Sequence, residues 1–190
     1  MSSINRQQLT EEEVLAKSVI NLILKEMNQS YIIQSVIEEV LNEKQIAYSI
    51  DEDQEKERNV IHMGFNLESG IVNTFFVIHY SIQIVELFTY LPINVPEEKR
   101  LQVSKFLDMV ETTFFLGSFQ LNHDDGRVRS KSYFTYDKNG MTNKAIDLHL
   151  AAVNHLANET FPDIMKICFG NRDADSVFSD NFKRIDVRMN

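Results

Sequence analysis

Apolar residues recur at helical spacing in two stretches near the start of the chain. The first, "LTEEEVLAKSVINLILKEM", opens with a Thr-x-x-Glu capping box at Thr10 and Glu13, and its apolar residues fall three and four apart. This predicts a helix over residues 10–27. After a break at residues 28–30, a second predicted helix gathers five apolar residues on one face: Ile33, Val36, Ile37, Val40 and Leu41.

The pattern then changes to short runs that are rich in β-branched and aromatic residues. The runs "VIHMGFNL", "IVNTFFVIHY" (residues 71–80) and "IVELFTYL" (residues 84–91) predict a meander of three antiparallel strands. A shorter strand-like piece, "AYSI", and a charged connector over residues 51–58 precede them. The run at residues 71–80 is apolar on both faces, which is typical of a central strand that is covered on both sides.

Helical spacing returns after Pro96, which with Glu97 and Glu98 is a typical helix start, and Gly117 ends this predicted helix. A hairpin follows, and then a last helix from about residue 142 to residue 160, which Pro162 is expected to kink or restart. After Gly170 the polar sequence predicts a loosely ordered tail.

This order of elements predicts an α+β fold in which an antiparallel sheet (three-strand meander, helix, hairpin) is flanked by helices. We expect three parts along the 190 residues: an accessory helix over residues 1–28, the α+β domain over residues 29–170 and the tail over residues 171–190.

The hairpin "FQLNHDDGRVRSKSYFTY" carries the most suggestive chemistry. Asp-Gly between two alternating runs is a strong hairpin signal. Alternation places Phe119, Leu121, Val128, Phe134 and Tyr136 on the core face. The opposite face then carries the candidate binding residues Arg127, Arg129, Lys131 and Tyr133. A basic stripe of this kind serves either as protection of a solvent-facing strand against aggregation or as a contact for an acidic partner.

The net charge of −9 argues against partners that are themselves polyanionic, namely nucleic acid and anionic lipid. A single cysteine, Cys168, excludes an internal disulfide and fits a reducing compartment. The first residues lack the apolar core of a signal peptide, and no run is long enough for a membrane helix, so we expect a cytoplasmic protein.

Catalytic and metal-binding signatures are weak. Consecutive residues such as His123, Asp124 and Asp125 do not converge on one ion, and a turn stabilised by aspartates explains them better. The sequence carries none of the phosphate-loop, nucleophile-elbow or zinc-protease motifs. We therefore expect no metal, no cofactor and no enzymatic activity.

The segment from Leu116 to Gly170, "LGSFQLNHDDGRVRSKSYFTYDKNG" followed by a helix and "FPDIMKICFG", is similar to the YbjN family of small bacterial proteins, sometimes labelled sensory transduction regulators. The resemblance implies a fold like that of type III secretion chaperones, which bind an unfolded segment of a partner protein and are often dimeric. A homodimer is therefore among the expected assemblies. The helix ending "VETTFF" departs from the family pattern, and no catalytic residues carry over.

Three functions remain open at this point. The first is a non-enzymatic, cytoplasmic protein-binding module, chaperone-like or regulatory, for which we expect exposed apolar surface. The second is a small-molecule or anion sensor that uses the basic strand Arg127/Arg129/Lys131, which predicts a pocket beside that strand. The third is an unrecognised hydrolase, which requires two or more of His62, His79, His123, Asp124 and Asp125 to converge.

Overall fold

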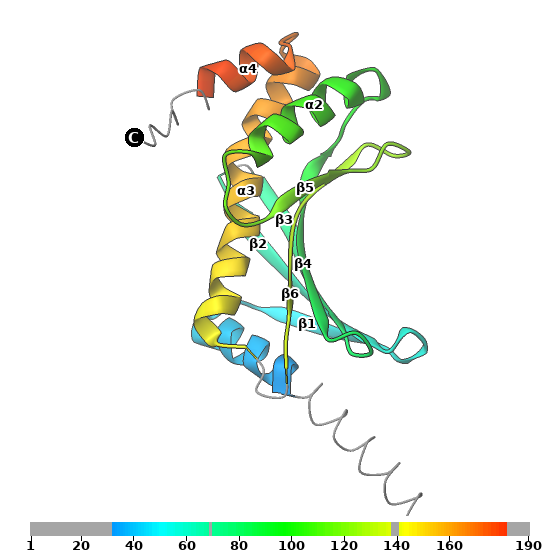
Figure 1. Cartoon of the computed structure of the whole chain (residues 1–190), viewed down its shortest axis with the longest axis vertical. Helices are drawn as coiled ribbons and strands as arrows, with labels where there is room; N and C mark the ends of the chain where they lie inside the picture. Colours follow the sequence, from blue (N-terminus) through cyan, green and yellow to red (C-terminus); the bar gives the residue numbers. More distant parts are fainter. Residues whose placement is uncertain (1–31, 69, 138–140, 182–190) are drawn as a thin grey trace, which may run out of the picture.

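The computed structural model describes residues 32–68, 70–137 and 141–181 and contains, in that part, a six-stranded antiparallel sheet with helices on one side (Figure 1). The strands lie in the order β1-β2-β3-β4-β6-β5. Their bounds are β1 Tyr48–Asp53, β2 Arg58–Leu67, β3 Gly70–His79, β4 Ile84–Asn94, β5 Ser118–Leu121 and β6 Arg127–Thr135. The predicted α+β class with an antiparallel sheet is confirmed.

The meander has four strands, where the sequence pattern predicted three. The "AYSI" piece extends into the acidic connector and pairs with β2 from Tyr48↔Met63 to Asp53↔Arg58. A strand at the edge of a sheet tolerates charged residues, because its side chains on the uncovered face lie in water. For this reason, the acidic residues of β1 gave no strand signal in the sequence.

The helical segments comprise residues 32–43, the short η1 Gln54–Lys56 and η2 Glu97–Lys99, α2 Arg100–Glu111, α3 Asn143–Phe169 and α4 Ala174–Asn181. The predicted helix over residues 10–27 lies outside the described residues. The sequence predicted a loosely ordered tail from residue 171, but residues 174–181 of this segment form helix α4. Its Ala174 and Val177 are buried, and Lys105 of α2 forms an ion pair of 2.5 Å with Asp175. Two buried small apolar residues in eight are too few to stand out in the sequence.

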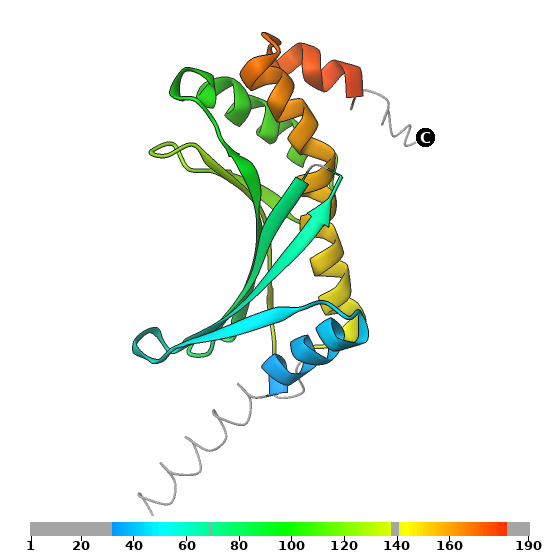
Figure 2. The ribbon, with the colours of Figure 1, turned by 180° about the vertical axis from the view of Figure 1, so that it is seen from behind.

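Helix α3 runs along the length of the sheet and packs against it and, at both of its ends, against the other helices (Figures 1 and 2). It begins at the cap Thr142, whose hydroxyl accepts a hydrogen bond from the backbone of Ala145, and it continues through Pro162 without ending. Near its start, Ile146 and Leu150 pack in one core with the helix over residues 32–43. Farther along, Leu156 and Ile164 pack in a second core with α2, α4 and β5.

A buried polar cluster fixes α3 against the middle of the sheet. Asn154 Oδ1 lies 3.1 Å from the hydroxyl of Thr74 on β3 and 3.0 Å from that of Thr89 on β4, and these hydroxyls are 2.7 Å apart. On β6, the Ser130 hydroxyl donates to the backbone carbonyl of Val153 at 2.7 Å. Buried hydroxyls need such partners, so the cluster allows only one position of the helix over these strands.

Substitution of Asn154 by alanine should lower the free energy of unfolding by about 1 to 3 kcal/mol, because it leaves buried hydroxyls without their common acceptor. Urea denaturation followed by far-UV circular dichroism measures the change. Glu159→Ala, on an exposed position of the same helix, is the control and should change stability by less than about 0.5 kcal/mol. Equal effects of the two substitutions would contradict the role assigned to Asn154.

Stability should also fall in mild acid because of His149 on α3. Burial lowers the pKa of this imidazole below its usual 6.5, and its Nδ1 lies 2.7 Å from the Ser132 hydroxyl. The folded state therefore favours the neutral ring. The neutral ring therefore contributes its full share to the free energy of unfolding when the pH is above the unfolded-state pKa of His149. This share is lost as the pH falls from there through the lowered folded-state pKa.

The urea midpoint of the native chain should thus drop more between about pH 7.5 and pH 5 than that of His149→Gln. His155→Gln, which changes an exposed histidine of the same helix, should keep the native pH dependence. If His149→Gln and the native chain respond identically to pH, the assignment fails.

Candidate binding face

The face of the sheet that turns away from α3 is not covered by any of the described helices. Both ends of the sheet bend away from α3, so this face is concave (Figures 1 and 2). We call it the open face. It presents the side chains of His62, Asn73, Phe75, Val77, Glu86, Phe88, Tyr90, Gln120, Arg127, Arg129, Lys131 and Tyr133, which alternate along their strands with the buried residues of the α3 side.

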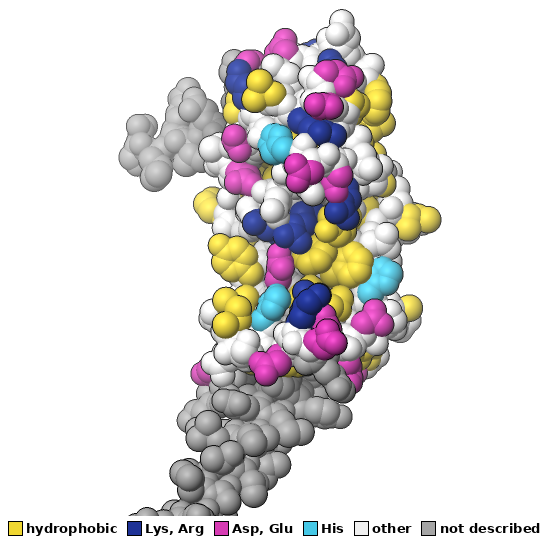
Figure 3. All heavy atoms as spheres, turned by 90° about the vertical axis from the view of Figure 1, so that its right-hand side faces the viewer, with side chains coloured by type: hydrophobic (Ala, Val, Ile, Leu, Met, Phe, Trp, Pro, Cys, Tyr) yellow, Lys and Arg dark blue, Asp and Glu magenta, His cyan; other side chains and the backbone are white. Residues whose placement is uncertain are grey.

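Four rings form a continuous aromatic cluster at the centre of the open face. Strand register places His62, Phe75 and Phe88 side by side on β2, β3 and β4. The His62 and Phe75 rings are stacked with centroids 4.7 Å apart, and Phe75 and Phe88 are stacked at 5.2 Å. Tyr90 meets the ring of Phe88 edge-on at 5.4 Å. Figure 3 shows this apolar surface at the middle of the face, with cationic side chains beside it.

Two guanidinium groups lie over the edge of this aromatic cluster. Arg129 sits 4.6 Å from the centre of the Phe88 ring, and Arg127 sits 5.6 Å from that of Tyr90. Phe88 is only 8% exposed although no described helix covers it, because its own neighbours on the face cover it. Cation–π contacts of this kind keep a positive charge over apolar surface at the boundary with water.

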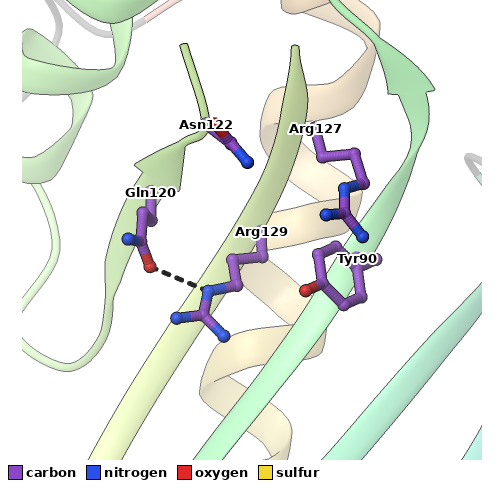
Figure 4. Close-up of a pocket in the computed structure, with 5 residues that line it drawn as sticks. All are labelled: Tyr90, Gln120, Asn122, Arg127 and Arg129. Atoms are coloured by element: carbon purple, nitrogen blue, oxygen red, sulfur yellow. Dashed lines mark hydrogen bonds between the residues drawn. The ribbon is translucent and has the colours of Figure 1, made fainter. Parts of the chain in front are cut away.

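A hollow of about 210 Å³ opens beside these arginines and is lined by Tyr90, Gln120, Asn122, Arg127 and Arg129 (Figure 4). The Gln120 side-chain oxygen accepts a hydrogen bond from Arg129 Nε at 2.8 Å, and the Asn122 side-chain oxygen accepts one from the backbone of Asp124 at 2.9 Å. Because both amide oxygens are engaged, the two amide NH₂ groups remain as donors. We call this site the donor hollow.

Two carboxylates hold the arginines in place from the side. Asp125 accepts from Arg127 Nε at 2.7 Å, and Glu86 lies 3.1 Å from a terminal nitrogen of Arg129. Arg127 uses one of its five N–H groups in this contact, and Arg129 uses two, because its Nε also donates to Gln120. The remaining N–H groups are left for a ligand. Lys131, one row farther along β6, forms no ion pair with any residue in the described part of the chain.

The hairpin turn that orients Arg127 is docked against the start of η2. The Gly126 carbonyl accepts from the backbone of Val95 at 2.8 Å, and Arg100 donates to the His123 carbonyl at 2.7 Å. The backbone N–H of Arg127 donates to Asp125, and this hydrogen bond, with the Arg127 guanidinium, lowers the pKa of the Asp125 carboxyl. The predicted role of the aspartates as turn residues is confirmed for Asp125.

All four candidate residues named from the sequence lie on the open face. Arg127 and Arg129 line the donor hollow, whereas Lys131 and Tyr133 lie beyond it along β6, with Tyr133 exposed. The aromatic cluster was missed, whereas alternation along the hairpin also assigns Gln120 and Asn122 to this face, although they were not among the candidate binding residues. The signal for the cluster was present in residues 71–80, which are apolar on both faces. We interpreted this pattern as cover on both sides, but the described helices cover only one side of the strand.

The residues required for a hydrolase do not converge. His62 pairs with Phe75, whereas His79 pairs with Arg58, four residues farther along the same strand pair. His62 contacts Asn73 at 3.1 Å, and His123 lies in the turn between β5 and β6. In the part of the chain that the structure describes, no three His, Cys, Asp or Glu side chains are grouped as metal ligands would be.

Comparison with known proteins gives a match in structure alone. No family model matches the chain, including one for the YbjN resemblance, and no curated protein matches its sequence. One solved structure, described as "Structure of the HopA1-SchA Chaperone-Effector Complex", matches over 70% of this chain and 94% of that chain, with 9% identity and a TM-score of 0.46. A TM-score below 0.5 at this identity carries no information on partner or activity. Among the described helices, none is long and apolar enough to cross a membrane.

Substitution of Gly126 by alanine should destabilise the chain by more than about 1 kcal/mol, because its φ of +79° is unfavourable for other residues and a Cβ there would lie 2.2 Å from the Val95 carbonyl oxygen. Gly64→Ala is the matched control on β2. A Cβ at that position meets nothing within 4 Å, so we expect no loss of stability. Thermal unfolding measures both variants, and a Gly126→Ala variant as stable as Gly64→Ala would contradict the docked turn.

Proposed function

We propose that this chain is a non-enzymatic, cytoplasmic protein-binding module, chaperone-like or regulatory, and that its open face binds a segment of another protein. The observation that carries the proposal is the aromatic cluster on a concave face that none of the described helices covers. Phe75 and Tyr90 are only partly buried there, and Tyr133 is 66% exposed. Contiguous apolar surface of this kind is typical of an interaction site.

The composition of the face supports a protein partner. Aromatic and arginine side chains are enriched at the centres of protein interfaces, because they combine a large contact area with specific hydrogen bonds. Here the phenylalanine rings lie at the centre and the arginines at their margin. Behind this surface, Asn154 and Ser130 join α3 to β3, β4 and β6 by hydrogen bonds.

Charge defines the partner further. The chain has a net charge of −9, yet Arg127, Arg129 and Lys131 stand together on the open face. A local positive patch on an acidic protein attracts a negatively charged part of a partner. The negative charge on the rest of the protein surface disfavours contact of that part at other places. The proposed partner segment therefore combines apolar side chains with at least one acidic group. A homodimer is a further proposal, because other surfaces remain available for it.

A second candidate is a small-molecule or anion sensor that uses the basic strand Arg127/Arg129/Lys131. The donor hollow favours this alternative, because it is a pocket beside that strand and its walls carry hydrogen-bond donors. A free anion would need the hollow alone, whereas a protein segment would need the aromatic cluster as well. The two candidates therefore differ in their dependence on Phe75.

Affinity capture with the full chain as bait tests the proposal. Phe75→Thr puts a β-branched residue, which suits a strand, in place of phenylalanine and removes the central ring of the cluster. We expect it to lose a stoichiometric protein partner that the native chain retains. Leu148→Ser, which removes a side chain that is 61% exposed on α3, is the control and should retain the partner. Circular dichroism confirms that both variants are folded. A partner that binds the native chain and Phe75→Thr equally would refute the proposed face.

A further inference from the structure

The donor hollow and the aromatic cluster lie on one surface at a separation that suits a single extended segment. Strand register places Phe75 and Arg129 two strands and two residues apart, which is about 12 Å between Cα atoms; Phe88 and Arg127 are one strand and four residues apart, or about 14 Å. In an extended chain, side chains on the same face repeat every second residue, so positions i and i+4 are about 13 Å apart. The i, i+4 spacing therefore joins Phe75 to Arg129 and Phe88 to Arg127, whereas Phe88 and Arg129 are adjacent, with the guanidinium 4.6 Å from the ring.

The chemistry of the hollow selects an acid. Arg127 and Arg129 present N–H groups there, and the amide nitrogen of Asn122 is turned toward them, whereas the Gln120 oxygen is engaged by Arg129 Nε (Figure 4). A carboxylate accepts several hydrogen bonds at once and pairs with guanidinium groups in a forked geometry. Asp125 and Glu86 each contact one edge of their arginine, which orients the guanidinium groups and leaves the remaining N–H groups for a ligand.

An extended segment fits better than a helix. A helix satisfies its own backbone hydrogen bonds, whereas an extended segment needs outside partners for its N–H and C=O groups. The rim of the open face supplies such partners in the Tyr133 hydroxyl and the Asn73 amide; the Asn73 oxygen contacts His62, so its NH₂ group is the part left to donate.

We propose that the open face recognises an extended, acidic segment of a partner protein; this inference rests on the proposed function. A large apolar or aromatic side chain of the segment packs on Phe75 and Phe88. A carboxylate four residues away in the segment enters the donor hollow. The motif is aromatic-x-x-x-acid, read in either chain direction. Arg127 and Arg129 are its specificity-determining residues. Lys131, outside the hollow, adds only general attraction for negative charge.

A phage-displayed library of random 12-residue peptides, panned on the full chain, tests the motif. We expect the recovered peptides to share an aromatic or large apolar residue and an Asp or Glu four positions apart. In a synthetic peptide of that sequence, replacing the acid by its amide should weaken binding at least tenfold, measured by fluorescence anisotropy. Enrichment of a seven-residue spacing, which suits a helix, would overturn the extended segment.

Variants of the protein separate the hollow from general electrostatics. Arg127→Gln should weaken the acidic peptide at least tenfold and leave the amide peptide unchanged. Lys131→Gln makes the same charge change on the same strand and face, and it should weaken both peptides by less than about threefold. Equal effects of the two substitutions, or equal affinity of the two peptides, would overturn the carboxylate site.

Two further comparisons show whether a negative result contradicts only the motif or also the proposed function. Recovered peptides that need Phe75 but neither an acid nor Arg127 would overturn this inference and leave the proposed function intact. Peptides that bind Phe75→Thr as well as the native chain would count against both. Inorganic phosphate and succinate at millimolar concentration should not raise the melting temperature of the native chain. A rise that Arg127→Gln abolishes would assign the hollow to a free anion and overturn the peptide site.

Discussion

The packing of α3 across one face of the sheet is the constraint on which the remaining structure depends. Helix α3 contributes buried side chains to both cores, from Ile146 at one end to Ile167 at the other. Asn154 fixes its position at the middle through Thr74 and Thr89. One helix is narrow compared with a sheet of six strands, so the other segments complete the layer: residues 32–43 at one end, and α2 with α4 at the other. In the described part of the chain, both of these cores lie on the same side of the sheet.

The consequence is an open face that must be stable in water although several of its residues are aromatic. The protein achieves this with neighbouring side chains instead of a second layer. Phe88 is covered by the Arg129 guanidinium and by adjacent rings, and Tyr90 lies beneath Arg127. Both guanidinium groups are held in this position, Arg129 by Gln120 and Glu86 and Arg127 by Asp125. Charged neighbours therefore shield part of the aromatic surface on this face from water.

The turn between β5 and β6 connects this surface to the core. Gly126 accepts a hydrogen bond from the backbone of Val95, and Arg100 holds the His123 carbonyl. Arg127 therefore leaves a turn that is fixed on two sides, and Asp125 orients its guanidinium. Asn122 belongs to the same turn, because its side-chain oxygen accepts from the backbone of Asp124. One set of local contacts thus determines both the shape of the hairpin and the donors that face the hollow.

The sequence by itself determined what depends on local spacing. The helix over residues 32–43, the strands of the meander, the Asp-Gly hairpin and the sorting of Arg127, Arg129, Lys131 and Tyr133 to one face all follow from periodicity and turn chemistry, which act over a few residues. Strand β1 and helix α4 gave weaker signals, because an acidic edge strand and a short helix depend on their neighbours for stability.

Only the tertiary structure decided which side of the sheet the helices cover, because the aromatic residues at 71–80 suit a buried face and an interaction surface equally well. It also brought Phe75 beside His62 and Phe88. Strand pairing joins residues that are far apart in the chain, and no pattern within one strand encodes its neighbour's register.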